Sequence, residues 1–586
     1  ATGRVVTNNG TFTKSGNCKI EGSSTIGSTI VNNGTATITA GTVSSTNYKA
    51  IYNGETSTTA KLTVSGGTIK SKETGIVNKA KGTVIVTNGT ITSTDVVVYN
   101  EAEGTVTISG GTLSTSNGDA IYCANANSNL NVSGGTITTT TSAGISIGNG
   151  TLTITGGKVT GKTYGIWTSE SHKPKVTIGA NDGKISVTSP AIIATEGTGV
   201  SIGSGVTLNF YDGVIKGATG KSITGTVTSV ATNCVIVKTT SGSTETAVLG
   251  PSVPVITAKL DNSSGASYTS GAWTNHNVWV QLKSASIGAG VKNYQWSEDG
   301  GATWLTDSLT TTNNTGTITF TADRNKEILF RAVDNNNVVS TVSKYVIRKD
   351  TVKPTVTINR KSTNTFEWKA SDAVGVTGYA ITTSSSTPTS WTTSGTLTSG
   401  TKTISTAGTY YVWVKDKSGN INKTSIAAYT MTRSQGTGST LTTRLDGTSA
   451  STGTSVTSNT VVLSETPVWA VATANTGYNT PVLKNGSTTI TASGTKVIIT
   501  ANTTISSSAT ANKYKVTLNN QSATTAGTAA FWYKYNTSTT VNGSTIYYYT
   551  DEAMTASPMT GNKITVPTKT GYTFGGYYTK TNGEGT

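Results

Sequence analysis

Short runs in which apolar and polar residues alternate fill the chain and predict β-strands throughout. Val, Ile and Thr recur at every second position, as in a pleated strand whose side chains point to opposite faces. Gly, Asn and Ser separate the runs, as they do in tight turns. No stretch carries a sustained 3.6-residue apolar period. The pattern therefore predicts an all-β protein.

One phrase, a short aliphatic strand followed by Gly-Gly-Thr-Ile or a close variant, recurs between about residues 35 and 215. Its second glycine advances by 22, 22, 24 and 22 residues, and the copies are Gly67, Gly89, Gly111, Gly135 and Gly157, with looser copies at Gly41, Gly183 and Gly213. No Lys-Ser/Thr and no helix follow, so these are not phosphate loops. We interpret Gly66-Gly67 and its copies as turns with positive φ.

A second phrase, a small residue, an aliphatic residue and a variable residue, follows the first at a nearly constant offset. Its copies begin at Ala50, Gly75, Val97, Ala120, Gly144, Gly165 and Ala191. Two or three strands in a repeat of 22–24 residues match the coil of a parallel β-helix, whose strands pair with those of the next coil. We therefore expect a parallel β-helix over residues 1–250, with a cap at its first coils. The phrases also resemble the right-handed β-helix repeats of bacterial surface proteins, over roughly residues 1–245.

The repeats stop at Pro251 and Pro254, where we expect a linker. Tyr294-Gln295-Trp296-Ser297-Glu298-Asp299-Gly300-Gly301 resembles a phrase of bacterial immunoglobulin-like modules, with Trp296 in place of the usual aromatic residue. This resemblance implies one β-sandwich over 251–350 and a second over 351–433, where Tyr410-Tyr411-Val412-Trp413 precedes the turn Ser418-Gly419-Asn420.

Residues 434–452 are rich in Ser, Thr and Gly and predict a flexible linker. It opens a small β repeat module over 434–510 that resembles tandem repeats of Gram-positive surface proteins. Residues 511–586 end with Gly571-Tyr572-Thr573-Phe574-Gly575-Gly576-Tyr577, which resembles the internalin-type B repeat, with Tyr577 where that family has Trp. The resemblance implies a β-grasp-like module, truncated here, and a longer natural chain. Together the modules predict an elongated rod.

Composition narrows the classes of protein. Only 12% of residues are charged, yet 10 Trp, 23 Tyr and many β-branched residues argue against disorder. The net charge of +16 is scattered along the chain, which favours general attraction to anionic surfaces over nucleic-acid binding. No run of 18 apolar residues exists, so we expect no membrane span, and the first residues carry no signal peptide. Cys18, Cys123 and Cys234 lie too far apart for a metal motif, and we expect no metal or cofactor.

Catalytic candidates are few. Asp95 and Asp119 precede the second phrase one coil apart, and paired carboxylates could serve a glycosidase or polysaccharide lyase. Both residues also suit turns, where Asp bonds its own backbone. His172 and His276, the two histidines, lie in different expected domains. We therefore expect a protein that is not an enzyme, with a polysaccharide-active enzyme as the alternative.

The variable residue of the second phrase should point outward from the β-helix, because side chains alternate along a strand. That column reads Tyr52, Val77, Tyr99, Tyr122, Ser146, Trp167 and Ile193. Neighbours in it should stand about 4.8 Å apart, similar to the length of a sugar ring. Tyr52, Tyr99, Tyr122 and Trp167 therefore form our candidate glycan-binding site, although stacked aromatic residues also stabilise neighbouring strands.

These features predict a secreted bacterial cell-surface adhesin. The β-helix would bind a host or environmental glycan or glycoprotein, and the later domains would form a stalk. A structural surface fibre without a specific ligand stays open as a further alternative. Host proteins, including antibodies, are possible partners, and we expect attachment to the cell wall through a C-terminal region outside this sequence.

Overall fold

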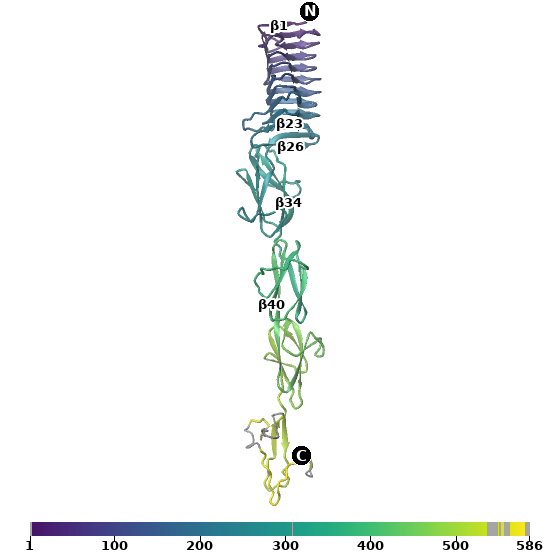
Figure 1. Cartoon of the computed structure of the whole chain (residues 1–586), viewed down its shortest axis with the longest axis vertical. Helices are drawn as coiled ribbons and strands as arrows, with labels where there is room; N and C mark the ends of the chain where they lie inside the picture. Colours follow the sequence, from purple (N-terminus) through teal and green to yellow (C-terminus); the bar gives the residue numbers. More distant parts are fainter. Residues whose placement is uncertain (1–2, 307–308, 536–548, 550–551, 556–562, 581–586) are drawn as a thin grey trace. The chain divides into compact units, whose positions relative to one another are not determined.

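The computed structural model describes residues 3–306, 309–535, 549, 552–555 and 563–580. Every regular element in these ranges is a β-strand, so the all-β prediction is confirmed (Figure 1). Among the described residues, no helix has the length and apolar character needed to cross a membrane. The chain divides into two compact units, Ala1–Lys349 and Asp350–Thr586, and we describe each by itself.

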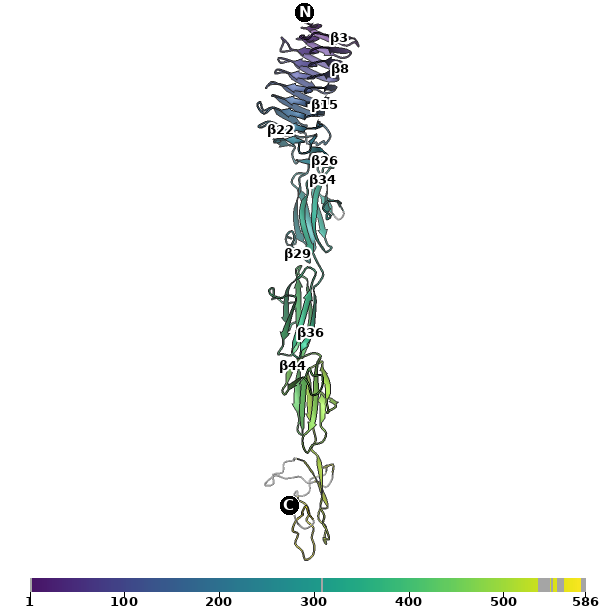
Figure 2. The same ribbon diagram turned by 90° about the vertical axis from the view of Figure 1, so that its right-hand side faces the viewer.

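The first unit begins with a stack of coils that forms a parallel β-helix, as predicted (Figures 1 and 2). Each coil contributes one short strand to a ten-stranded sheet, here called the first sheet. Every strand pairs in parallel with the equivalent strand of the next coil. In order, the strands are β1 (Val6–Asn8), β4 (Ile30–Asn32), β7 (Ile51–Asn53), β9 (Ile76–Asn78), β11 (Val98–Asn100), β14 (Ile121–Cys123), β16 (Ala143–Ile147), β18 (Tyr164–Thr168), β21 (Thr198–Ser201) and β24 (Ile223–Thr224).

The remaining strands of the coils form the other faces of the β-helix. In four coils two of these strands run together as one strand of 11 residues that passes through the glycine phrase. The strands are β2 (Thr11–Lys14), β3 (Lys19–Gly22), β5 (Thr35–Ile38), β6 (Thr42–Ser45), β8 (Lys61–Ser71), β10 (Thr83–Ser93), β12 (Thr105–Ile108), β13 (Thr112–Thr115), β15 (Asn129–Thr139), β17 (Thr151–Gly161), β19 (Lys175–Ile178), β20 (Ala191–Ala194), β22 (Thr207–Phe210), β23 (Val214–Ala218) and β25 (Ser229–Val230).

Aliphatic side chains fill the interior of the coils. In the first sheet, Ile51, Ile76, Val98 and Ile121 are each 0% exposed and lie in register, one above another. Burying such a side chain contributes about 1.5–3 kcal/mol, and each coil repeats the gain. The core is thus a set of aliphatic columns that run along the β-helix.

The glycine phrase marks places where successive coils approach closely. We predicted positive φ for both glycines of the phrase, and this is right only for the second: Gly67 and Gly111 have φ of +72° and +79°, whereas φ of Gly66 and Gly110 is not positive. The first glycine has a different reason: a Cβ on Gly66 or Gly110 would lie 2.2 Å from the backbone oxygen of Thr39 or Thr87 in the preceding coil. Both positions therefore exclude any side chain.

A ladder of buried asparagine side chains runs beside the aliphatic column of the first sheet. In its first four members, the Nδ2 donates a hydrogen bond to the Oδ1 of the asparagine in the next coil, over 2.6–2.9 Å. Its members are Asn8, Asn32, Asn53, Asn78 and Asn100. A Cβ on Gly82 would lie 2.5 Å from the Asn78 Oδ1, so the connecting turn needs glycine to pass over the ladder.

An antiparallel hairpin caps the last coil. It consists of β26 (Val235–Ser241) and β27 (Thr244–Gly250), and β27 pairs antiparallel with β23. We expected a cap at the first coils; in the described residues, the first-coil strands β1, β2 and β3 pair only with the second coil. Antiparallel pairing ends the parallel repeat because the hairpin offers no strand in the direction that another coil would need.

The β-helix packs against a β-sandwich within the first unit. One sheet contains β28 (Pro254–Leu260), β30 (Val278–Ser284), β33 (Thr315–Phe320) and β32 (Thr310–Thr312). The other contains β29 (Trp273–Thr274), β35 (Ser343–Lys349), β34 (Arg324–Asp334) and β31 (Val291–Ser297). The Asn336 Nδ2 donates to the Ile185 oxygen over 2.7 Å and joins the two domains.

The second unit contains two further immunoglobulin-like sandwiches that share a strand. The first has β36 (Thr355–Ser362), β37 (Thr365–Ser371) and β39 (Ser399–Thr403) in one sheet, and β38 (Val376–Thr382) and β40 (Gly408–Asp416) beside the shared strand β41 (Ile421–Gln435) in the other. The second has β43 (Thr454–Val456), β42 (Ser439–Leu445), β45 (Thr466–Ala474) and β48 (Thr495–Ile499) in one sheet. Its other sheet joins β44 (Thr460–Leu463), β46 (Val482–Asn485), β47 (Thr488–Ile490) and β49 (Thr503–Ser508) to β41.

The predicted flexible linker at 434–452 is therefore wrong for its first half. Strand β41 runs on to Gln435 and pairs with β49, and β42 follows after three residues. Arg360 and Asp446 form an ion pair of 2.6 Å between the two sandwiches. Composition misled the prediction because Ser and Thr serve exposed strands as well as linkers.

The C-terminal segment contributes the antiparallel pair β50 (Lys513–Thr517) and β51 (Ala530–Lys534). Bridges join Thr525 to Thr568 and Lys569 to Tyr572. Parts of the predicted B repeat lie outside the described residues, and the identity of this module stays a prediction.

Candidate functional sites

The predicted aromatic column lies on the outer face of the first sheet. Register pairs Tyr52 with Val77, Val77 with Tyr99, Tyr99 with Tyr122, Tyr122 with Ser146 and Ser146 with Trp167. We call this set of six residues the outward ridge. The strands at its start are three residues long and have buried first and last residues, so only the middle residue of each points outward.

Ile193 does not belong to this column. Its strand β20 pairs with β17, on another face of the β-helix, and Ile193 lies opposite Thr160. Ser201 of β21 takes the position beside Trp167. The prediction failed there because the looser copy at Gly183 lies outside any strand. Ala191-Ile192-Ile193 pairs with the part of the strand that follows the glycines of the coil before, and so takes the place of the first phrase.

The rings of the outward ridge are half-buried and cover the small residues between them. Tyr99 and Tyr122 stack with ring centroids 5.4 Å apart and planes 5° from parallel. At this distance and angle, the two rings turn one face toward each other. Val77 is 0% exposed and Ser146 is 4% exposed although both point outward. The aromatic rings on either side provide the cover that this burial requires.

Charged side chains border the ridge on both sides. Lys79 and Glu101, which directly follow β9 and β11, form an ion pair of 3.8 Å. A hydrogen bond with the Tyr52 hydroxyl, together with Glu101, raises the pKa of Lys79. Burial raises the pKa of the Tyr99 hydroxyl, and the Glu101 carboxylate adds to the shift. Lys79 and Glu101 therefore place a pair of opposite charges beside the ridge.

The opposite border carries Lys49, Glu73, Asp95 and Asp119. Burial lowers the pKa of Lys49, but its hydrogen bond to Tyr48 and the charge of Glu73 outweigh this, and the net shift is upward. Asp95 donates its backbone N–H to the Glu73 oxygen of the coil before, over 3.3 Å. The Asp119 Oδ1 accepts from the Ser142 hydroxyl at 2.5 Å and from the Ala143 N–H at 3.0 Å.

The two catalytic candidates therefore sit in coil-to-coil turns. The Asp119 carboxylate accepts from Ser142 and Ala143 of the next coil, whereas the turn interpretation expected it to bond its own backbone. Within the described part of the β-helix, no three acidic, His or Cys side chains converge as a lyase metal cluster would need. The histidines are apart as expected: the His172 Nδ1 lies 2.8 Å from the Ser171 hydroxyl, and the His276 Nδ1 lies 2.8 Å from Asp261 in the sandwich.

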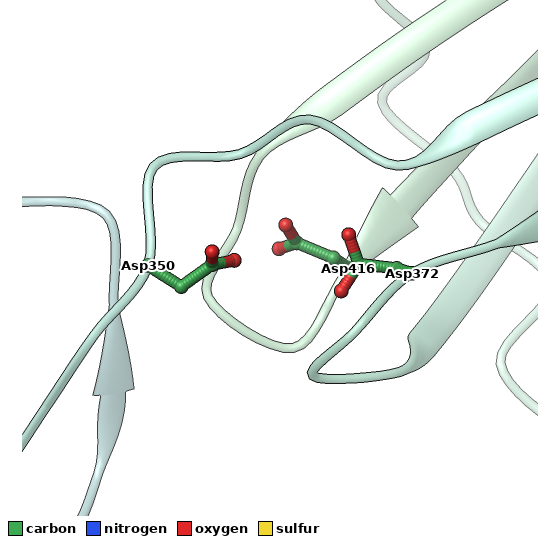
Figure 3. A group of neighbouring side chains, drawn as sticks. All are labelled: Asp350, Asp372 and Asp416. Carbon is green, nitrogen blue, oxygen red and sulfur yellow. The ribbon is translucent and has the colours of Figure 1, made fainter. Parts of the chain in front are cut away.

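A group of three carboxylates that we did not predict lies in the second unit. Asp350, Asp372 and Asp416 each place an oxygen within 4.8 Å of the others, and their side chains point toward one another from three separate segments (Figure 3). Asp416 is 1% exposed and Asp350 is 8% exposed. No described Lys, Arg or His forms an ion pair with Asp372 or Asp416. Such an all-oxygen group could hold a hard cation such as Ca²⁺.

Turn hydrogen bonds position these carboxylates. The Asp416 Oδ1 accepts from the N–H groups of Gly419 and Asn420, over 2.7 and 2.8 Å. The Asn420 Nδ2 donates to the Asp416 Oδ2 over 2.8 Å. Asp334 holds the equivalent turn of the first sandwich by accepting from the Val338 N–H over 2.8 Å. The sequence could have pointed to each Asp at the end of a strand before a tight turn. Only the folded structure shows that three such turns come together.

Comparisons with known proteins add little. No family model matches the chain, and no curated protein matches it. A crystal structure of the FN1–FN3 domains of chicken CNTN1 is similar at 12% identity, covering 43% of this chain and 84% of that chain with a TM-score of 0.17. A TM-score this low carries no argument about function. What the geometry establishes is an all-β chain in which a parallel β-helix precedes immunoglobulin-like sandwiches, an architecture that fits a surface stalk or a binding protein.

Proposed function

We propose that this chain is a secreted bacterial surface protein that binds a glycan or glycoprotein on the outward ridge of its β-helix. The later modules then serve as a stalk toward the cell. The observation that carries the proposal is the ridge itself: four aromatic side chains, Tyr52, Tyr99, Tyr122 and Trp167, on one exposed face.

Aromatic rings bind sugars because their flat apolar faces pack against the C–H groups of a pyranose ring. Half-buried rings suit this role, since packing against the sheet fixes their orientation before the ligand arrives. Exposed apolar groups gathered in one place mark interaction sites more often than scattered ones do. The ridge therefore supports binding better than a purely structural fibre.

The alternative of a polysaccharide-active enzyme is weaker. A glycosidase needs one carboxyl group free to protonate the leaving oxygen and a second as nucleophile or base. Asp119 already accepts two hydrogen bonds, from Ser142 and Ala143. Incubation of the chain with polysaccharides, followed by chromatography of the products, tests this alternative directly, and released oligosaccharides would favour it.

A glycan array probed with the whole chain tests the proposed function. We expect selective binding that the double variant Tyr122→Ala, Trp167→Ala loses. Thr107→Ala is the matched control, because Thr107 is a half-buried residue in β12 on another face of the β-helix. An array without bound glycans would overturn the proposal, and so would equal binding by the double variant.

A further inference from the structure

Resting on glycan binding by the ridge, we propose that its ligand is a neutral, linear polysaccharide lying parallel to the axis of the β-helix. The ridge gives three independent reasons: its width, its length and the charges along its borders. The width and the length distinguish an extended chain from the terminal sugar of a branched glycan. The charges distinguish a neutral chain from a polyanion.

Width is the first reason. Strands β7, β11 and β14 each expose only their middle residue and β9 exposes none, so the ridge is at most a single side chain wide. A terminal sugar is commonly held by groups that converge on it from several sides, as in a concave pocket. A ridge one residue wide cannot surround a sugar. It can only contact one face of a chain that lies along it.

Length is the second reason. From Tyr52 to Trp167 the ridge crosses five strand-to-strand steps, which span about 24 Å at 4.8 Å per step. Val77 and Ser146 are buried between the rings, so the ridge alternates aromatic rings with buried small side chains along this length. A sugar unit in an extended chain advances by a length similar to one step. The four rings occupy the first, third, fourth and sixth positions of the ridge, so a linear ligand of six units could contact all of them.

Charge is the third reason. The whole chain carries +16, yet the ridge borders do not share this excess. Lys79 is paired with Glu101, and Lys49 lies beside Glu73. Lys49 and Lys72 on this border are matched by Glu73, Asp95 and Asp119, so the border has no net positive charge. Carboxylates accept hydrogen bonds from sugar hydroxyls, whereas they repel the carboxylates or sulfates of a polyanion.

Calorimetric titration of the whole chain with neutral β-1,4-linked oligosaccharides tests the inference. Gluco-, xylo-, manno- and N-acetylglucosamine series, from dimers to octamers, are the probes. For at least one series we expect affinity to rise about tenfold or more from dimer to hexamer and then level off, with little dependence on salt. Tyr52→Ala, at one end of the ridge, should lower the length at which affinity levels off.

A charge variant separates neutral from anionic ligands. Asp95→Asn should weaken binding of the neutral hexamer about threefold or more, because a charged acceptor becomes a neutral one. Affinity that is independent of chain length would overturn the linear ligand while leaving glycan binding intact. Tighter binding of polyuronates or sulfated glycans, strengthened by Asp95→Asn and lost at high salt, would overturn the neutral one. Absence of binding to any glycan would instead overturn the proposed function itself.

Discussion

The three cysteines show how the same residue type acquires different chemistry from its surroundings. Cys18 is exposed, Cys123 is 0% exposed and Cys234 is 6% exposed. Burial raises the pKa of the Cys123 thiol to about 12 and also raises that of Cys234. Because the thiolate is the reactive form, this burial makes the Cys123 thiol unreactive at pH 8.

Thiol titration at pH 8 should therefore count one fast-reacting cysteine in the folded chain and three in denaturant. Cys18→Ser should remove the fast phase and leave the denatured count at two. Rapid reaction of a second thiol in the folded chain would show that the β-helix interior opens more readily than its packing implies.

The carboxylate group in the second unit makes a prediction about metal-free stability. Asp372→Asn keeps the Oδ1 that accepts the Val374 N–H over 2.8 Å but removes one of three neighbouring negative charges. Like charges this close oppose one another. In EDTA we expect the variant to raise the free energy of unfolding by about 0.5–1 kcal/mol.

Thermal melts in EDTA measure this difference. Glu367→Gln is the control, since it removes one negative charge from the same sandwich outside the group. A lower midpoint for Asp372→Asn in EDTA would contradict the electrostatic account of the three carboxylates.

Sequence predicted the residues of the ridge better than the residues of the acidic group. Tyr52, Tyr99, Tyr122 and Trp167 share one repeat, so their alignment follows from its period. Asp350, Asp372 and Asp416 come from three turns separated by irregular lengths of chain. Only the packing of the sandwich sets their distances, and no local pattern encodes it.

At the scale of elements, the asparagine ladder links the coils more strongly than strand pairing alone. The Asn78 side chain donates to the Gly82 oxygen and to the Asn100 Oδ1, and it accepts from Asn53. Asn78→Ala removes all three hydrogen bonds inside a buried column. We expect it to lower the free energy of unfolding by about 2–4 kcal/mol.

Denaturant unfolding of the whole chain, followed by a probe of the β-helix, measures this loss. Asn131→Ala, an exposed position on β15, should change stability by less than about 0.5 kcal/mol. A similar effect for both variants would mean that the ladder contributes no more than any strand residue.

The ladder was readable in the sequence, whereas the shared strand was not. Asn follows the aliphatic residue by two positions at Asn32, Asn53, Asn78 and Asn100, which is a repeat in its own right. Strand β41 gave no such signal, because its Ser- and Thr-rich end resembles a linker. Its pairing with β49 depends on residues about 70 positions later in the chain.

At the scale of the whole molecule, the fold class followed from the sequence and the function did not. Period and alternation fix which residues face inward, and this determines a β-helix without further information. A ligand is recognised by residues that point outward, and the fold accepts many residue types at those positions. Thr, Tyr and Lys all suit an outward strand position, so the sequence offers candidates but no selection among them.

The central claim is that the outward ridge binds sugar and is not merely packing for the coils. Titration of the best ligand from the array into wild type and into the Tyr122→Ala, Trp167→Ala double variant tests it, with the thermal midpoint of each recorded. We predict that affinity falls at least about 100-fold, while the β-helix loses only about 0.2–1 kcal/mol for each broken ring contact. Unchanged affinity in a destabilised variant would contradict the claim and leave the ridge a packing role alone.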